Sequence, residues 1–126
     1  MLEQLPIDKI YFLDIETVPQ YPSYEDLPED FKELWDKKAE RLLGGEEEEG
    51  PGGIYNKAGI FAEFGKIVCI SVGIFTREAK KLSFRIKSFS GKNEKELLEQ
   101  FSLLLGVKFF NPKENFLCAH NGKEFE

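Results

Sequence analysis

The stretch Ile10–Thr17 constrains the fold most, because four apolar residues run directly into two acids separated by one residue. A nearly all-apolar run of this length is typical of a strand that is covered on both faces, as at the centre of an α/β sheet. Side chains of a strand alternate between faces, so Asp14 and Glu16 should point the same way and Ile15 the opposite way. Two carboxylates at the end of a buried strand need neutralisation, which a divalent cation usually provides. The simpler alternative is a strand that ends in ordinary polar residues.

The composition is that of an ordinary globular chain, with 126 residues of which 41% are hydrophobic and 32% charged. This length predicts a single domain, residues 1–126, with a core of its own. No apolar run approaches the roughly 20 residues of a membrane helix, and no secretory signal is present, so we expect a cytoplasmic protein without membrane contact. Cys69 and Cys118 lie within apolar runs and are expected to be buried free thiols.

The net charge of −6 argues against binding of nucleic acid by bulk electrostatic attraction. It leaves open an enzyme that holds a few phosphates through bound metal ions, because the cations would supply the positive charge.

The first half of the chain predicts one helix and one loop. Proline, Glu29 and Asp30 favour a helix start near residue 28, and glycines at 44 and 45 favour its end near residue 43. Helical spacing of apolar residues supports this span, with a lysine as the exception; the positions are Phe31, Leu34, Trp35, Lys38, Ala39 and Leu42. Residues 44–53 combine glycines with four successive glutamates and are expected to form a solvated, flexible acidic loop rather than a phosphate cradle.

The second half predicts a β-hairpin, a helix and a last strand. Residues 66–75 form a β-branched apolar run, residues 77–80 a turn, and residues 82–87 an edge strand. In that edge strand Leu82, Phe84 and Ile86 should form the dry face.

Asn93 should cap a helix that ends at Gly106, and residues 116–119 should form a strand. We expect the opening and last strands to be parallel neighbours in a mixed α/β sheet. Ligands of such sheets bind at the carboxyl ends of the strands, so Asp14, Glu16 and the segment after residue 120 should converge.

Two acidic motifs in this order resemble the DEDD-type 3′–5′ exonucleases of the ribonuclease H-like fold, in particular the proofreading exonuclease domain of family B DNA polymerases. The family's first motif, Asp-x-Glu at the end of the first strand, is matched by Asp14-Ile15-Glu16. Its second motif, Asn-x-x-x-Phe/Tyr-Asp, is matched by the segment from Asn121 to Phe125, with Glu126 in place of the aspartate. The lead into the family's second strand is similar to residues 63–71.

The resemblance implies two-metal hydrolysis of phosphodiester bonds from nucleic-acid 3′ ends with Mg²⁺ or Mn²⁺. Asp14 would bridge both ions, Glu16 would bind one of them, and Glu126 would act through a water. Thr17, Asn121 and Phe125 would contact the 3′ end of single-stranded DNA or RNA.

The family's third motif, a Tyr or His followed by the fourth aspartate, has no counterpart in the sequence. The resemblance therefore implies a C-terminally truncated and inactive form that self-associates through an uncovered sheet edge. A nuclease-dead domain that binds nucleic acid or a protein is the alternative from another class, and an unrelated α/β domain with coincidental acids is the third.

Overall fold

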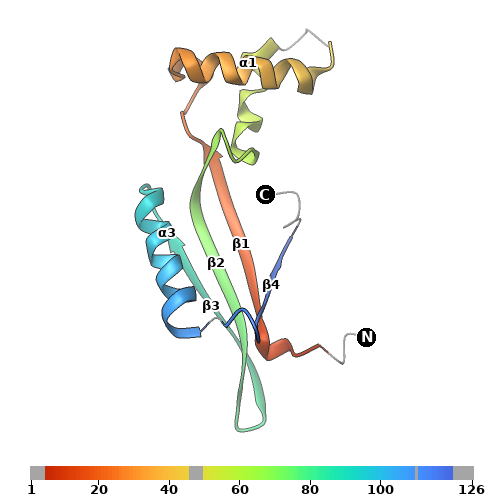
Figure 1. The fold of residues 1–126 in the computed structure, drawn as a ribbon, viewed down its shortest axis with the longest axis vertical. Coiled ribbons are helices and arrows are strands. Elements are labelled where there is room, and N and C mark those ends of the chain that lie inside the picture. Colours follow the sequence, from red (N-terminus) through yellow and green to blue (C-terminus); the bar gives the residue numbers. More distant parts are fainter. Residues whose placement is uncertain (1–4, 46–49, 110, 121–126) are drawn as a thin grey trace. The chain divides into compact units, whose positions relative to one another are not determined.

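The computed structural model describes residues 5–45, 50–109 and 111–120. Along the chain (Figure 1) the elements are η2 (Ile7–Lys9), β1 (Ile10–Pro19), η3 (Tyr24–Asp26), α1 (Glu29–Leu43), α2 (Gly50–Gly53), η4 (Tyr55–Ile60), β2 (Gly65–Glu78), β3 (Lys81–Ser90), α3 (Glu94–Leu103), η5 (Leu104–Phe109) and β4 (Phe116–Ala119). None of the helices in these ranges is long and apolar enough to cross a membrane.

The four strands form one mixed sheet in the order β3-β2-β1-β4. β2 and β3 are an antiparallel hairpin, in which Phe75 lies opposite Phe84. β1 and β4 are parallel neighbours, with Ile10 opposite Phe116 and Leu13 opposite Ala119. The predictions of an α/β fold with a mixed sheet, of β3 at an edge and of a parallel β1–β4 pair are therefore confirmed.

The chain divides into two compact units, which we call the sheet unit and the inserted unit. The sheet unit combines residues 1–16 with most of the chain from residue 67 onwards. The inserted unit consists essentially of residues 17–66, which include the far end of β1, helix α1 and the first residues of β2.

Helix α3 packs on one face of the sheet and forms the core of the sheet unit with it. The buried side chains of this core are Tyr11, Ile70, Val72, Phe89 and Leu97. Partly buried neighbours complete it, namely Leu13, Ile15, Ile67, Ile74, Phe101, Leu104 and Leu105. Alternating residues of β1 supply three of these side chains, which fixes the face on which the intervening residues lie.

The start of α3 follows the prediction and its end does not. Asn93 caps the helix, since its Oδ1 accepts a hydrogen bond from the backbone N–H of Glu96 at 3.2 Å. Glu94, in the first turn, accepts a hydrogen bond from the backbone N–H of Ile67 in β2. The predicted stop at Gly106 is wrong, because the chain continues through that glycine as the π-helix η5.

Two further predictions for the sheet unit are corrected. Leu82, Phe84 and Ile86 of β3 were expected on a dry face, yet they are 51%, 47% and 65% exposed. The alternation is as predicted, but α3 covers the opposite face, where Phe89 is buried. Cys69 and Cys118 are free thiols, but neither is buried as predicted: Cys69 is half-buried, and Cys118 is exposed because β4 has no covering element among the described residues.

The two-residue turn of the β2–β3 hairpin is built from residues that do not suit it. Ala79 and Lys80 both have positive φ, 48° and 68°. Such turns prefer Asn-Gly, because a Cβ in the left-handed region costs about 1–2 kcal/mol per residue.

We therefore expect the double substitution Ala79→Asn, Lys80→Gly to stabilise the chain by about 1 kcal/mol, which corresponds to a Tm increase of roughly 3–6 °C. Thermal unfolding followed by circular dichroism measures this shift. An unchanged or lower Tm would show that the turn is not strained as the backbone angles indicate.

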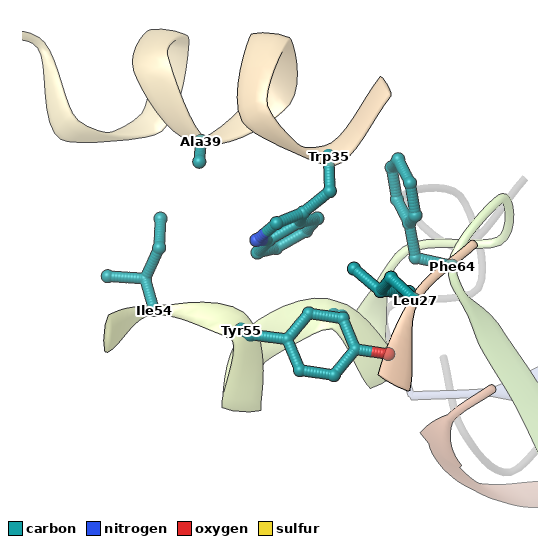
Figure 2. Packing of buried hydrophobic residues seen from close by; sticks show 7 residues of the cluster. Leu27, Trp35, Ala39, Ile54, Tyr55 and Phe64 are labelled. Carbon is teal, nitrogen blue, oxygen red and sulfur yellow. The ribbon is translucent and has the colours of Figure 1, made fainter. Parts of the chain in front are cut away.

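The inserted unit has a separate core that is rich in aromatic side chains (Figure 2). Its buried residues are Leu27, Trp35, Ala39, Ile54, Tyr55, Ala58 and Phe64. The Trp35 indole projects from α1 toward Tyr55 and Phe64, and its Nε1 donates a hydrogen bond to the carbonyl of Pro51 at 2.8 Å.

The periphery of this core is tied by polar contacts. Tyr24 donates its hydroxyl hydrogen to Asp36 at 2.7 Å, and this bond, with a smaller effect of burial, raises the pKa of Tyr24 to about 12. Lys38, the polar exception in the predicted stripe, forms an ion pair with Glu63 at 2.9 Å and lies over the ring of Phe61.

Helix α1 occupies the predicted span, but its predicted apolar stripe is only partly buried. Trp35 and Ala39 are buried, whereas Leu34 and Leu42 are 55% and 47% exposed. The helix ends at Gly44, which has a left-handed φ of 58°. Within the segment 44–53, residues 50–53 form the short helix α2, and residues 46–49 lie outside the described ranges.

Candidate functional site

Asp14 and Glu16 lie on the same face of β1, a strand with neighbours on both sides in the sheet. Both side chains are exposed, while Leu13 and Ile15 point to the opposite face and pack in the core against α3. The predicted orientation of the two acids is therefore confirmed. The face they occupy is the one that α3 leaves uncovered, which we call the outer face.

The end of β4 lies beside this pair. β4 runs parallel to β1, and its last residue, Ala119, is level with Leu13. His120 therefore follows Ala119 at the level where Asp14 follows Leu13, and its side chain is exposed. The carboxyl end of β4 therefore lies beside the two acids, as expected from the sequence. The prediction that the acids end the first strand is wrong, because β1 continues past them to Pro19.

The two carboxylates are unpaired among the residues that the structure describes. Neither Asp14 nor Glu16 has a hydrogen bond or an ion pair within those ranges. Residues two apart on one strand face lie about 6.5–7 Å apart at Cα. Their carboxylates can therefore contact one cation directly or through its water shell. Over the same ranges, no group of three or more His, Cys, Asp or Glu side chains gathers.

Of the four remaining predicted site residues, Thr17 lies within the described ranges and the other three lie outside them. The Thr17 hydroxyl donates a hydrogen bond to the carbonyl of Gly59 at 2.6 Å, so its proton is already used within the inserted unit. Asn121, Phe125 and Glu126 lie outside the described residues, and their predicted roles stay predictions.

The carboxylate oxygens of Asp14 and Glu16 are suitable ligands for a hard divalent cation, but two carboxylates are fewer ligands than such an ion requires. Mg²⁺ takes six oxygen ligands at about 2.0–2.1 Å and keeps several waters, so one or two protein carboxylates can hold it weakly. Asp14 and Glu16 are the described residues that would hold such an ion.

Two groups of the outer face were not anticipated from the sequence. Ser71 and Ser88 place their hydroxyl oxygens 2.7 Å apart across the hairpin. The rings of Phe12, Phe75 and Phe84 pack together at centroid distances of 4.7–6.2 Å. The sequence signal that could have revealed both groups is the alternation of side chains along β2. It places Ser71 and Phe75 on the face opposite the buried Ile70 and Val72.

Comparisons with known proteins found no protein-family model, no curated protein and no solved structure that matches the chain significantly.

Proposed function

We propose that the chain carries the metal-binding carboxylates of a ribonuclease H-like 3′–5′ exonuclease. In this proposal Asp14 and Glu16 hold Mg²⁺ or Mn²⁺, and the reaction is hydrolysis of phosphodiester bonds from the 3′ ends of single-stranded DNA or RNA. The observation that carries the proposal is the pair itself: two exposed acids on one face of β1, unpaired among the described residues.

The pair has no structural benefit that would explain it. Asp and Glu are disfavoured in strands, and two like charges on one strand face repel each other. Most residues of β1 around the pair are apolar or partly buried, so the acids interrupt a sequence that otherwise suits a central strand. Two repelling acids within a strand of this kind are therefore better explained by a functional site that needs both charges than by a contribution to stability.

The roles of the chain's own residues follow from charge and position. Asp14 and Glu16 would anchor the cation on the outer face of β1, beside the carboxyl end of β4, where a substrate would bind. When bound, divalent cations supply Lewis-acid assistance to phosphodiester hydrolysis. Bound cations would also reduce the repulsion between the carboxylates and the phosphates of the substrate. The protein itself cannot do so, because its net charge is −6.

Release of labelled nucleotide from 3′-labelled single-stranded DNA tests the proposal, with the chain in excess over DNA and Mn²⁺ as the cation. The missing third motif predicts an inactive chain, but two carboxylates that hold Mn²⁺ should still support slow release that requires this ion. We expect Asp14→Ala to reduce the rate by a factor on the order of 100 or more. Glu99→Ala removes another exposed acid, from α3, and should leave the rate unchanged.

Two outcomes would overturn this function. Release that persists in Asp14→Ala would show that the nuclease site lies elsewhere or in a contaminant. Binding of the oligonucleotide without any Mn²⁺-dependent release would favour the nuclease-dead binding domain.

A further inference from the structure

The outer face of the sheet exposes a contiguous apolar patch, which we call the outer patch. Its members alternate along four strands and share the side away from α3; they are Phe12, Phe75, Leu82, Phe84, Ile86 and Phe116. Strand register places Phe84 opposite Phe75, and Phe116 opposite Ile10, two residues before Phe12. Four of the six are about half exposed, namely Leu82, Phe84, Ile86 and Phe116.

The alternation in β3 shows that this exposure is not a random scatter of apolar side chains. The outer face takes Leu82, Phe84 and Ile86, while the other face of the same stretch takes Arg85 and Lys87. A strand with a fully solvated outer face would not concentrate its apolar residues there. The pattern therefore indicates a face that is covered by something.

The centre of the outer patch is preorganised. The ring of Phe84 lies directly over Gly73, where the Cβ of any other residue would come within 2.2 Å of the ring's Cζ. Phe12 packs edge-on against both Phe75 and Phe84, at centroid distances of 5.9 and 6.2 Å. Because neighbours already hold these rings, little side-chain entropy would be lost when a partner covers them.

Opposite charges flank the patch at its two ends along the strands. β1 and β2 run in opposite directions (Figure 1), and Phe12 is level with the Phe75–Phe84 pair. Asp14 therefore lies beyond the aromatic centre on one side, and Arg77, which pairs with Leu82, lies beyond it on the other.

We propose that a second copy of this chain covers the outer patch, face to face, related by a twofold axis through the aromatic centre. This axis lies in the plane between the two sheets and runs perpendicular to the strands, so it turns the two outer faces toward each other and reverses the strand direction. Arg77 of one copy then faces Asp14 of the other, twice over, while the apolar residues meet in between. Isologous contacts of this kind are the commonest form of homo-oligomer.

Charge favours a second copy over nucleic acid as the occupant. A single-stranded nucleic acid would stack on the rings but needs a cationic groove for its backbone. Among the described outer-face positions beside the rings, Arg77 is the cation, and Asp14 and Glu16 are acids that would repel phosphate. A surface with both signs complements itself.

The size of the patch sets the expected affinity. Two of the four half-exposed residues are phenylalanines, which carry about 150–250 Å² of surface each, and the other two are the somewhat smaller Leu82 and Ile86, so together they offer on the order of 350 Å² per copy. Stable interfaces bury about 800 Å² per partner, so the dimer belongs at the weak end. We expect a dissociation constant on the order of 10 µM.

Sedimentation equilibrium of the full chain tests the proposal, between about 1 and 100 µM and in EDTA so that no cation competes for Asp14. We expect a monomer–dimer equilibrium, and Ile86→Lys should weaken it by a factor of about ten or more. Ile60→Lys is the matched control, because Ile60 is 61% exposed against 65% for Ile86 and lies in the inserted unit. Both substituted side chains are exposed, so neither variant should unfold the chain.

Charge reversal provides a second test of the orientation. Arg77→Glu should weaken the dimer, and adding Asp14→Lys in the same chain should restore part of the affinity. A wild-type chain that stays monomeric at 100 µM overturns the proposal. So does a dimer that Ile86→Lys leaves intact, which would point instead to pairing of the free edge of β3 or β4.

Discussion

Replacing Trp35 with alanine is expected to destabilise the inserted unit by about 3–5 kcal/mol, the usual cost of removing a fully buried tryptophan side chain. The indole is 0% exposed and packs against Tyr55 and Phe64 at centroid distances of 5.5 and 5.1 Å. Its loss would also leave the Pro51 carbonyl without the Nε1 donor. Whole domains are stable by about 5–15 kcal/mol, so this substitution should remove a large part of the stability.

Hydrogen exchange measures the effect where it is expected, in the backbone amides of residues 17–66. Leu34→Ala is the control, since Leu34 is the adjacent residue of α1 but 55% exposed, and its effect should stay within about 1 kcal/mol. Trp35→Phe retains a ring but loses the hydrogen bond, and should fall between the two. Equal exchange in Trp35→Ala and Leu34→Ala would show that the aromatic core does not hold this unit together.

The strands, the hairpin and both long helices could be predicted from the sequence because local signals specify them. Asn93 caps α3 through a hydrogen bond within one turn, and Gly44 ends α1 because it tolerates positive φ. Parallel pairing of β1 with β4 follows from connection rules that leave few arrangements for helix-linked strands.

What covers each face could not be predicted, because it depends on tertiary packing. The alternation in β3 shows two faces but does not tell which one α3 covers, and the apolar face proves to be the exposed one. Likewise, helical spacing places Leu34 beside Trp35, whereas the position of the residues after α2 decides that only Trp35 is buried. Passage through Gly106 as a π-helix also has no simple sequence signal.

Half of the candidate site could be predicted from the sequence. Asp14 and Glu16 share a face because side chains of any strand alternate, and that inference needs no tertiary information. The proposed second half depends on Asn121, Phe125 and Glu126, which lie outside the described residues. The central claim therefore concerns the pair in β1, and its strongest expected consequence is metal binding.

Neutralising either acid of the pair should abolish most of the affinity for a divalent cation. Two carboxylates on one strand face create a local negative potential, and each supplies an oxygen that Mn²⁺ or Mg²⁺ accepts. Removing one charge leaves a single exposed carboxylate, which binds such ions no better than other surface acids. In the absence of metal, Asp14→Asn should leave the fold at least as stable, since it also removes the repulsion between the two acids.

Titration of the chain with Mn²⁺, with free Mn²⁺ followed by electron paramagnetic resonance, tests the claim most directly. The variants are Asp14→Asn and Glu16→Gln, with Glu99→Gln as the matched change of an exposed acid on α3. The account predicts a saturable site in the wild-type chain and in Glu99→Gln, with affinity at least about tenfold weaker in the other two. Equal Mn²⁺ binding by all four proteins would contradict a metal site at Asp14 and Glu16.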